Sequence, residues 1–147
     1  MNLKKGIINT MEQYTKTSQT KSGSERKKLV KQLDHVIRDI LKQGEDRCVC
    51  CGKSGLGWFH PKDNPYGLQV GHYVSRTVYA LRWDLKNVHP QCSGCNYQHN
   101  NNPIPYTRFM LDHYGKEILD QLTFKRGQIN KVSTPRLREL LEELQKL

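Results

Sequence analysis

Two pairs of cysteines constrain what this chain can fold into more than any other feature. Cys48 and Cys51 form one C-x-x-C pair, and Cys92 and Cys95 form another, with 40 residues between the pairs. Each pair fits on a tight turn and supplies two thiolates, and four thiolates suit tetrahedral zinc. The spacing therefore predicts a structural Zn²⁺ site that joins two distant parts of the chain. A redox pair or buried thiols are the alternatives.

The fifth cysteine, Cys50, lies between the members of the first pair. An odd number of cysteines in a reducing compartment argues against a disulfide framework. The segment CVCCG is best explained with its outer two cysteines as ligands and Gly52 completing the turn. We therefore expect Cys50 to lie outside the metal site, with substitution for a neighbouring ligand as the alternative.

Composition sets broader limits on the chain. At 147 residues, we expect one domain with modest appendages. Apolar residues make up 35% of the chain, which is low for one packed core, and a bound metal would relieve that shortage. The net charge of +10 is spread along the chain. It is typical of a protein with a polyanionic partner, most commonly nucleic acid, and a merely soluble basic protein is the alternative that charge alone leaves open. With no long apolar run, we expect no membrane partner and a cytoplasmic location.

Helix signals lie toward both ends of the chain. Ser22 and Glu25 have capping-box spacing, an amphipathic pattern follows, and Gly44 ends it. Near the C-terminus, leucines from Leu137 to Leu147 form one stripe, which favours core packing over a dimer face. The sequence thus divides into a basic N-terminal arm (1–23), an amphipathic helix (24–44), a zinc-stapled core (45–122) and a C-terminal helix (123–147).

The central core has a mixed pattern. A short strand is predicted around residues 68–74 and a second extended segment at 79–83, with a helix from residue 106 and a further helical turn or two at 116–122. The fold class is therefore α+β.

The polar residues of the core follow the order that a one-metal ββα nuclease needs. His72 ends the first strand, and its ordinary pKa suits a general base that activates water. Asn87 lies on the linking loop and can hold the orientation of His72. Asn96 follows Cys95 directly, where it can place a divalent ion at the scissile phosphate. His99, one helical turn later, could supply another ligand to that ion.

Five segments resemble the phage NinG/Rap recombination proteins, which are small HNH-type nucleases associated with branched DNA. They are CVCCG, VGHY, LRWDLKNVHPQCSGCN, NPIPY and the later HYG. The resemblance covers roughly residues 47–122. The layout is more distantly similar to phage endonuclease VII, which resolves branched junctions around a four-cysteine zinc. The resemblance to the NinG/Rap proteins implies a ββα-metal (HNH, or His-Me finger) core flanked by helices. It also implies that the protein acts in the cytoplasm of a phage-infected host.

The resemblance assigns roles by position. His72 matches the histidine of the GHY motif and is expected to be the general base. Asn87 matches the middle asparagine of the HNH pattern, and Asn96 matches a metal-binding asparagine of the endonuclease VII layout. His89 matches the histidine of the N-x-H-x-Q-C block, so it is expected either near the phosphate or bracing the loop.

The chain departs from the family pattern at the catalytic metal. Many HNH sites have an aspartate directly before the general base, where this chain has Gly71. NinG/Rap relatives can carry an acid two residues earlier still, where this chain has Gln69. Magnesium usually takes at least one carboxylate, so Mg²⁺ would bind weakly here, and a softer ion such as Mn²⁺ is the alternative.

These observations predict a metal-dependent DNA endonuclease that cuts branched or Holliday-junction DNA in phage recombination. Three cations lie close in sequence to the site and are candidates to hold DNA phosphates, with ordinary surface charge as the alternative: Arg76, Arg82 and Lys86. Because such junctions have two-fold character, we expect a homodimer, built by the N-terminal helix or the leucine stripe. The alternative is a non-catalytic, zinc-containing module that binds nucleic acid.

Overall fold

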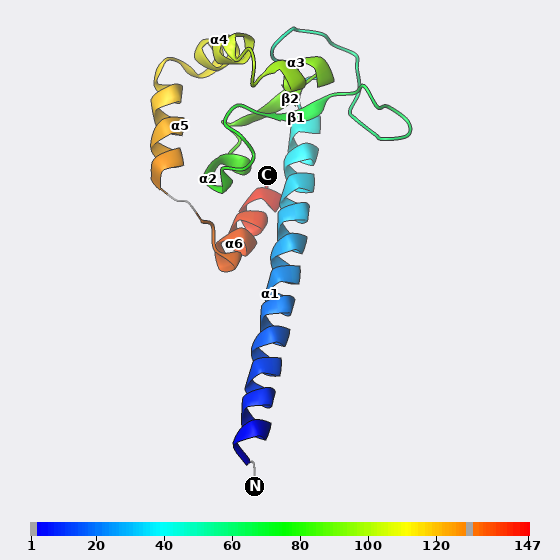
Figure 1. The fold of residues 1–147 in the computed structure, drawn as a ribbon. Coiled ribbons are helices and arrows are strands. Elements are labelled where there is room, and N and C mark those ends of the chain that lie inside the picture. Colours follow the sequence, from blue (N-terminus) through cyan, green and yellow to red (C-terminus); the bar gives the residue numbers. More distant parts are fainter. Residues whose placement is uncertain (1–2, 129–130) are drawn as a thin grey trace.

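The computed structural model describes residues 3–128 and 131–147, with side chains from Ser22 onward. It is a mixed α+β fold around one two-stranded sheet, in agreement with the predicted class. Its elements are α1 (Leu3–Lys42), β1 (Gln69–His72), α2 (Tyr79–Arg82), β2 (Val88–Gln91), α3 (Ser93–Gln98), α4 (Ile104–Tyr114), α5 (Glu117–Gln128) and α6 (Thr134–Gln145) (Figure 1).

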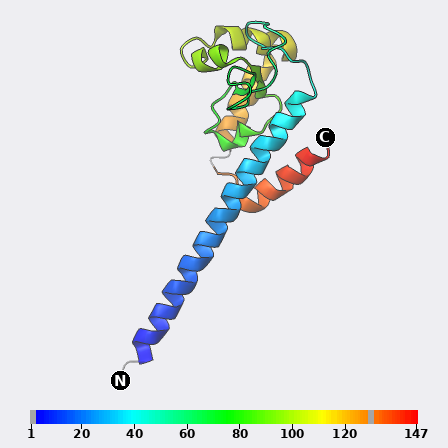
Figure 2. The same ribbon diagram turned by 90° about the vertical axis from the view of Figure 1, so that its right-hand side faces the viewer.

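Helix α1 is a single helix of 40 residues whose N-terminal part projects away from the rest of the molecule (Figures 1 and 2). The predicted helix start at Ser22 is wrong, because the helix runs without interruption from Leu3. Gly23 costs only about 1 kcal/mol relative to alanine inside a helix, and serine costs less. Since no proline interrupts residues 3–42, these weak breakers do not end the helix.

The first core joins the C-terminal half of α1 to α6, which run side by side (Figure 2). Its buried members are Leu29, Leu33, Ile37, Trp83, Val88, Leu137, Leu141 and Leu144. The prediction that the leucine stripe is core packing is confirmed, and the stripe is therefore not free to build a dimer. Only its last member, Leu147, is largely exposed, at 69%.

The predicted C-terminal helix is divided differently in the structure. Helix α5 extends to Gln128, so it crosses the predicted boundary at residue 123. Helix α6 begins only at Thr134, where the Ser133 side chain accepts a hydrogen bond from the Arg136 amide. This cap, with Pro135 in the first turn, fixes the helix start that the sequence suggests.

Strands β1 and β2 pair antiparallel, with Gln69 opposite Gln91 and His72 opposite Val88. A Cβ atom at Gly71 would lie 1.9 Å from Gln91 Oε1, so the close approach at this position requires glycine. The second strand is therefore residues 88–91, next to the second cysteine pair.

The predicted extended segment at 79–83 is wrong, because these residues form the single turn of α2. In a strand, Leu81 and Trp83 would point to the same face. The helical turn instead sends Trp83 into the first core and Leu81 into a second core beneath α4 and α5. None of the helices in the described ranges combines the length and the hydropathy needed to cross a bilayer.

Candidate active site and metal centre

The four predicted zinc ligands meet in one place. The Sγ atoms of Cys48, Cys51, Cys92 and Cys95 all lie within 4.8 Å of one another. Hydrogen bonds hold the two turns together, since the Val49 amide donates to the Pro90 carbonyl at 3.0 Å. Four thiolates at this separation fit a tetrahedral Zn²⁺ site, as the sequence predicted.

The turn around the first pair explains why Cys50 is not a ligand. Gly52 has a φ of 76°, and its amide donates to the Cys48 carbonyl at 2.9 Å, which closes the turn between the outer two cysteines. Cys50 neighbours Cys48, and its Sγ accepts a hydrogen bond from Gln91 Nε2 at 3.1 Å. Cys50 therefore lies outside the four-cysteine cluster.

His72 is held in one defined orientation at the end of β1. Its Nε2 lies 2.9 Å from the Arg82 carbonyl oxygen. A carbonyl can only accept, so Nε2 carries the hydrogen and Nδ1 of the neutral ring keeps its lone pair. Burial lowers the pKa of His72 below its usual value, and the nearby guanidinium groups of Arg76 and Arg82 lower it further. A neutral ring with an unprotonated Nδ1 is the form that a general base needs.

Asn87 is fully buried and ties together the loop between β1 and β2. Its Oδ1 accepts from the Val74 amide at 2.8 Å. Its Nδ2 donates to the carbonyls of Val74 and Leu81, each at 3.0 Å. Because the Arg82 carbonyl that holds His72 follows Leu81 directly, Asn87 supports the orientation of His72 through the backbone.

Asn87→Ala should destabilise the fold by roughly 2–4 kcal/mol, because it leaves one buried N–H and two carbonyls with a lost partner. Urea unfolding followed by circular dichroism measures this change. Asn101→Ala, at an exposed position after α3, is the matched control and should leave the midpoint unchanged. Equal midpoints for the two variants would show that the Asn87 hydrogen bonds do not hold the loop.

Asn96 contacts the residue at which relatives can carry an acid. Its Nδ2 lies 2.8 Å from Oε1 of Gln69, the first residue of β1. The two side chains border an open hollow of about 500 Å³, whose lining also includes Ser93, Gly94 and Tyr97. If the Asn96 carboxamide turns over, both residues present amide oxygens to the same point. These are neutral hard donors, which fit a weakly held divalent ion.

The structure does not place His99 beside the Gln69–Asn96 pair. Its Nε2 donates to the Tyr73 carbonyl at 2.8 Å. Its Nδ1 is buried and has no hydrogen-bond partner among the described residues. Because His99 does not line the hollow that Gln69 and Asn96 border, the structure does not support the expectation that His99 binds the catalytic ion there. Its contact with Tyr73 instead joins the end of α3 to the residue that follows β1.

Both ring nitrogens of His89 make hydrogen bonds. Tyr106 donates its hydroxyl hydrogen to the Gly71 carbonyl at 3.1 Å, so His89 Nδ1 donates to the Tyr106 oxygen at 2.9 Å. Nε2 then accepts from the Tyr114 hydroxyl at 2.6 Å. Burial lowers the pKa of His89 to about 4, with a smaller effect from His113. Of the two expected roles, the structure shows the bracing one, with no nitrogen free for a phosphate.

Strand alternation separates the remaining candidates. Successive side chains of a strand point to opposite faces, so Gln69 and His72, three residues apart, lie on different faces of the sheet. Asn96 lies on the Gln69 face. His72 therefore does not oppose Asn96 across a closed cavity, contrary to the arrangement expected from the sequence. The two groups are joined only along β1, whose three-residue separation spans about 10 Å.

Comparison with known proteins adds the decisive observation about ancestry. A family model described as Bacteriophage Lambda NinG protein matches residues 4–147. The chain belongs to the NinG family. Curated relatives include protein ninG of Escherichia phage 933W, at 29% identity over 100 residues, and of Escherichia phage lambda, at 28% over 100 residues. Protein ninG of Enterobacteria phage H19B is 30% identical over 96 residues.

Each of these NinG matches covers 63% of this chain and 43% of the relative. The matched region thus spans less than half the length of the curated NinG proteins. No solved structure matches this fold.

The three cations expected to hold DNA have different surroundings. Arg82 is buried and forms a two-point ion pair with Asp34 of α1, at 3.1 Å from Nε and 2.6 Å from the terminal nitrogen. The expectation that Arg82 holds a phosphate is therefore wrong, since its charge is already satisfied. Arg76 has a side chain that is 64% exposed and lies 4.0 Å from the same carboxylate. Lys86 is exposed, with Nζ 3.5 Å from Gln121 Oε1.

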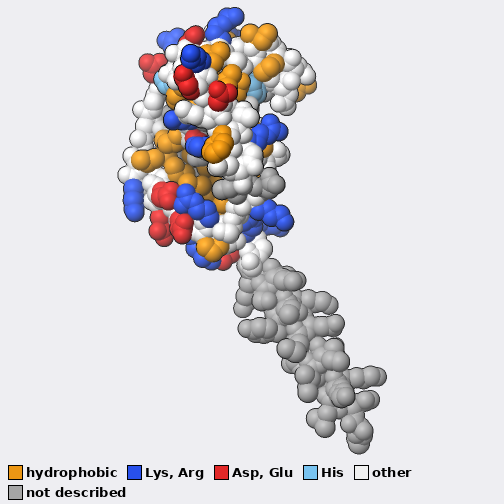
Figure 3. All heavy atoms as spheres, turned by 90° about the vertical axis from the view of Figure 1, so that its left-hand side faces the viewer, with side chains coloured by type: hydrophobic (Ala, Val, Ile, Leu, Met, Phe, Trp, Pro, Cys, Tyr) orange, Lys and Arg blue, Asp and Glu red, His pale blue; other side chains and the backbone are white. Residues whose placement is uncertain are grey.

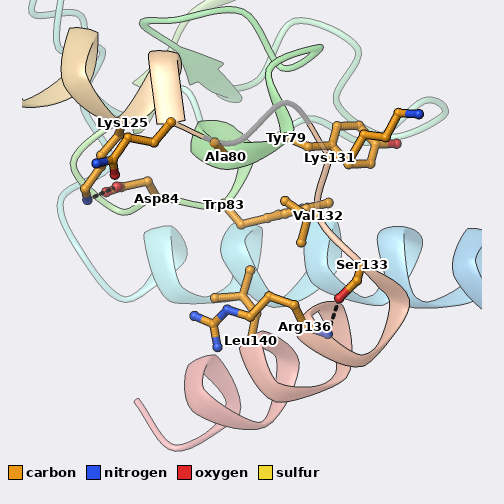
Figure 4. A pocket seen from close by; sticks show the side chains of 11 residues that line it. Tyr79, Ala80, Trp83, Asp84, Lys125, Lys131, Val132, Ser133, Arg136 and Leu140 are labelled. Atoms are coloured by element: carbon orange, nitrogen blue, oxygen red, sulfur yellow. Dashed lines mark hydrogen bonds and ion pairs between the residues drawn. The ribbon is translucent and has the colours of Figure 1, made fainter.

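A separate hollow of about 620 Å³ lies between α2, α5 and α6. Tyr79, Trp83 and Leu140 give it an apolar lining (Figure 4). Figure 3 shows hydrophobic side chains, in orange, among charged ones on one face of the molecule. Two of the cations that line the hollow have acidic partners, since Lys125 pairs with Asp84 at 2.5 Å and Arg136 with Glu143 at 2.8 Å. We assign the candidate chemistry to the β1 region instead.

Sequence reasoning missed the groups that support the site. The Asp34 carboxylate on α1 and the hydroxyls of Tyr106 and Tyr114 on α4 fix the loop and the sheet from distant elements. No short-range pattern marks them, because each acts through a contact with a residue far away in the sequence. The NPIPY and HYG segments contain Tyr106 and Tyr114, but neither segment indicates that the hydroxyl contacts His89.

Proposed function

We propose that this NinG-family chain is a metal-dependent DNA endonuclease in which His72 is the general base. The observation that carries the proposal is the hydrogen bond from His72 Nε2 to the Arg82 carbonyl, which leaves Nδ1 as the only basic atom of the ring. Membership in a phage recombination family and the net charge of +10 support DNA as the substrate.

In the proposed reaction, His72 Nδ1 takes a proton from a water molecule while the water oxygen attacks phosphorus. The bond from phosphorus to the 3′-oxygen breaks, and that oxygen takes a proton from solvent. Arg76, exposed beside His72, holds a phosphate oxygen. A divalent ion, Mg²⁺ or Mn²⁺, bound at the carboxamide oxygens of Gln69 and Asn96 would supply charge neutralisation at the phosphate.

The side chains of His72 and Gln69 point to opposite faces of the sheet, and this limits where the DNA can lie. Both side chains, and that of Asn96, are half-buried rather than enclosed. A phosphate that crosses the edge of β1 could be approached by His72 from one face and by the amide pair from the other. The proposal therefore places the DNA backbone along this edge rather than in a closed cavity.

Gln69→Asp should raise the affinity for Mn²⁺ by roughly tenfold or more, because it adds the carboxylate that such sites usually contain. Isothermal titration with Mn²⁺ measures the change. Gln98→Asp adds the same charge at an exposed position of α3 outside the hollow, and should bind Mn²⁺ like the natural chain. If both variants gain affinity equally, the Gln69–Asn96 pair is not an ion site.

Branched DNA is the substrate that we propose on the basis of the NinG/Rap resemblance, with four-way junctions cut by a dimer. The leucine stripe is buried in α1–α6 packing, so α1 is the remaining candidate for the dimer contact. Sedimentation with a four-way junction tests this, since two chains per junction are expected.

A non-catalytic DNA-binding module is the second candidate. The amide pair without a carboxylate, on the opposite face from His72, favours it. A cleavage panel decides between the two, using four-way junction, fork, single strand and plain duplex, each with Mg²⁺ and with Mn²⁺. Nicking or cutting of any substrate supports the endonuclease, whereas tight binding without cleavage under all conditions supports the module.

A further inference from the structure

The open hollow beside the Gln69–Asn96 pair has one aromatic wall. Tyr97 follows Asn96 directly on α3, and both line the same space of about 500 Å³. The remaining wall is Ser93 and Gly94, and a Cβ atom at Gly94 would meet nothing within 4 Å. The hollow is thus wide, polar at its base, and bordered by a single ring.

Tyr97 is unusually exposed for a large aromatic residue, at 79%. Within the described part of the chain, its ring stacks on no other ring and its hydroxyl makes no hydrogen bond. The other rings of this region, such as Tyr73, Tyr106 and His99, pack against one another at centroid distances of 5.0–5.6 Å. Tyr97 therefore makes no contribution to the core that would explain its position.

We propose that Tyr97 stacks on an unpaired base of the DNA strand whose phosphate lies at the Gln69–Asn96 pair. This inference rests on the proposed DNA substrate and names the structural class that the site selects. It makes Tyr97 a specificity-determining residue, and it assigns DNA with unpaired nucleotides next to the bound phosphate as the preferred ligand.

The selection follows from the geometry of stacking. In a paired duplex, both faces of each base are covered by neighbouring bases, so a protein ring cannot lie on them. At a branch point, flap or single strand, a base face is free, and aromatic side chains stack on any such base regardless of sequence. The ring of Tyr97 stands one residue from the amide pair, close enough for one nucleotide to occupy both.

Binding of DNA labelled with 2-aminopurine tests the proposal in the presence of Mn²⁺. The full chain carrying His72→Ala, which blocks cleavage, is titrated with a bubble duplex labelled at each unpaired position and with a fully paired duplex. We expect fluorescence quenching at one or two bubble positions. Adding Tyr97→Ala should remove this quenching and weaken bubble binding by roughly fivefold to a hundredfold, with paired duplex affected little.

Two further variants separate stacking from a general surface effect. Tyr97→Trp should restore the quenching and the affinity, because it retains an aromatic face. Tyr66→Ala removes an equally exposed tyrosine, at 78%, from outside the hollow and should change neither. If Tyr97→Ala leaves quenching intact, or weakens bubble and duplex binding equally, the proposal is overturned.

The outcome is distinguishable from failure of the endonuclease proposal. Cleavage by the natural chain together with unchanged bubble preference in Tyr97→Ala would overturn the stacking role alone. Quenching that depends on Tyr97, with no cleavage of any substrate, would overturn catalysis alone. Absence of DNA binding would overturn both.

Discussion

His72→Ala is expected to reduce DNA cleavage by roughly 10²–10⁴-fold while leaving DNA binding within about twofold of the natural chain. The range is the usual contribution of a positioned general base. Binding should persist because His72 carries no charge when its ring is neutral, and because the exposed Arg76 is unchanged. Cleavage of a four-way junction under single-turnover conditions, with binding measured by anisotropy, checks both parts.

The pH dependence of cleavage gives a second readout of the same residue. The neutral form of His72 is the active form, and burial lowers its pKa below 6.5. Activity should therefore be retained as the pH falls through 6.5 and be lost only below it, when the ring becomes protonated. An acid limb centred above 6.5 would contradict this assignment.

His35→Ala is the matched control, since it removes an exposed histidine from α1. It should cut DNA at the natural rate. If His72→Ala also retains full cleavage, another residue activates the water. If neither the natural chain nor any variant cuts, the DNA-binding module is the better description.

Cys48→Ser is expected to abolish zinc binding and to unfold the region between α1 and α4. Cys48 is fully buried and belongs to the four-sulfur cluster. Structural zinc contributes about 10–16 kcal/mol of apparent binding free energy in zinc-finger peptides, which is comparable to the whole stability of a domain, about 5–15 kcal/mol. Metal analysis and thermal unfolding measure the two effects.

Cys50→Ser provides the control within the same turn. It keeps the four ligands and replaces a thiol that accepts a hydrogen bond from Gln91, which a hydroxyl can also accept. It should bind one zinc per chain and unfold close to the natural midpoint. Loss of zinc in this variant, with retention in Cys48→Ser, would show that Cys50 replaces a neighbour as ligand.

Removal of zinc by a strong chelator should reproduce the effect of Cys48→Ser. The α1–α6 pair has its own apolar core, so we expect helical signal from it to remain after the metal is removed. Complete loss of helicity would indicate that this pair is stable only when attached to the metal-bound core.

Local patterns predicted the parts of the fold that depend on neighbouring residues. The cysteine spacing predicted the metal cluster, and the leucine period predicted the packing of α6. Other predictions failed where distant contacts compete with local preference. The Ser-Gly-Ser segment did not end α1, and residues 79–83 became helical because two separate cores take Leu81 and Trp83.

The candidate site shows the same division. Sequence similarity indicated His72, Asn87 and Asn96, and the structure describes a hydrogen-bonding environment for each. It could not indicate that Asp34 neutralises Arg82, or that two tyrosines occupy His89. These pairings join residues up to 48 positions apart, and only folding brings them into contact.

The sequence alone indicated the four thiols of the metal cluster through their spacing, the helices near both ends of the chain through their apolar period, and the family through its motifs. The tertiary structure alone decided which polar groups remain free to act. Arg82 and His89 have all of their interacting groups occupied by neighbours from α1 and α4, and His99 does not line the hollow beside Asn96. Within the described part of the chain, His72 keeps an unpaired Nδ1, and the carboxamides of Gln69 and Asn96 bond to each other at the border of an open hollow, so these groups remain as the candidate site.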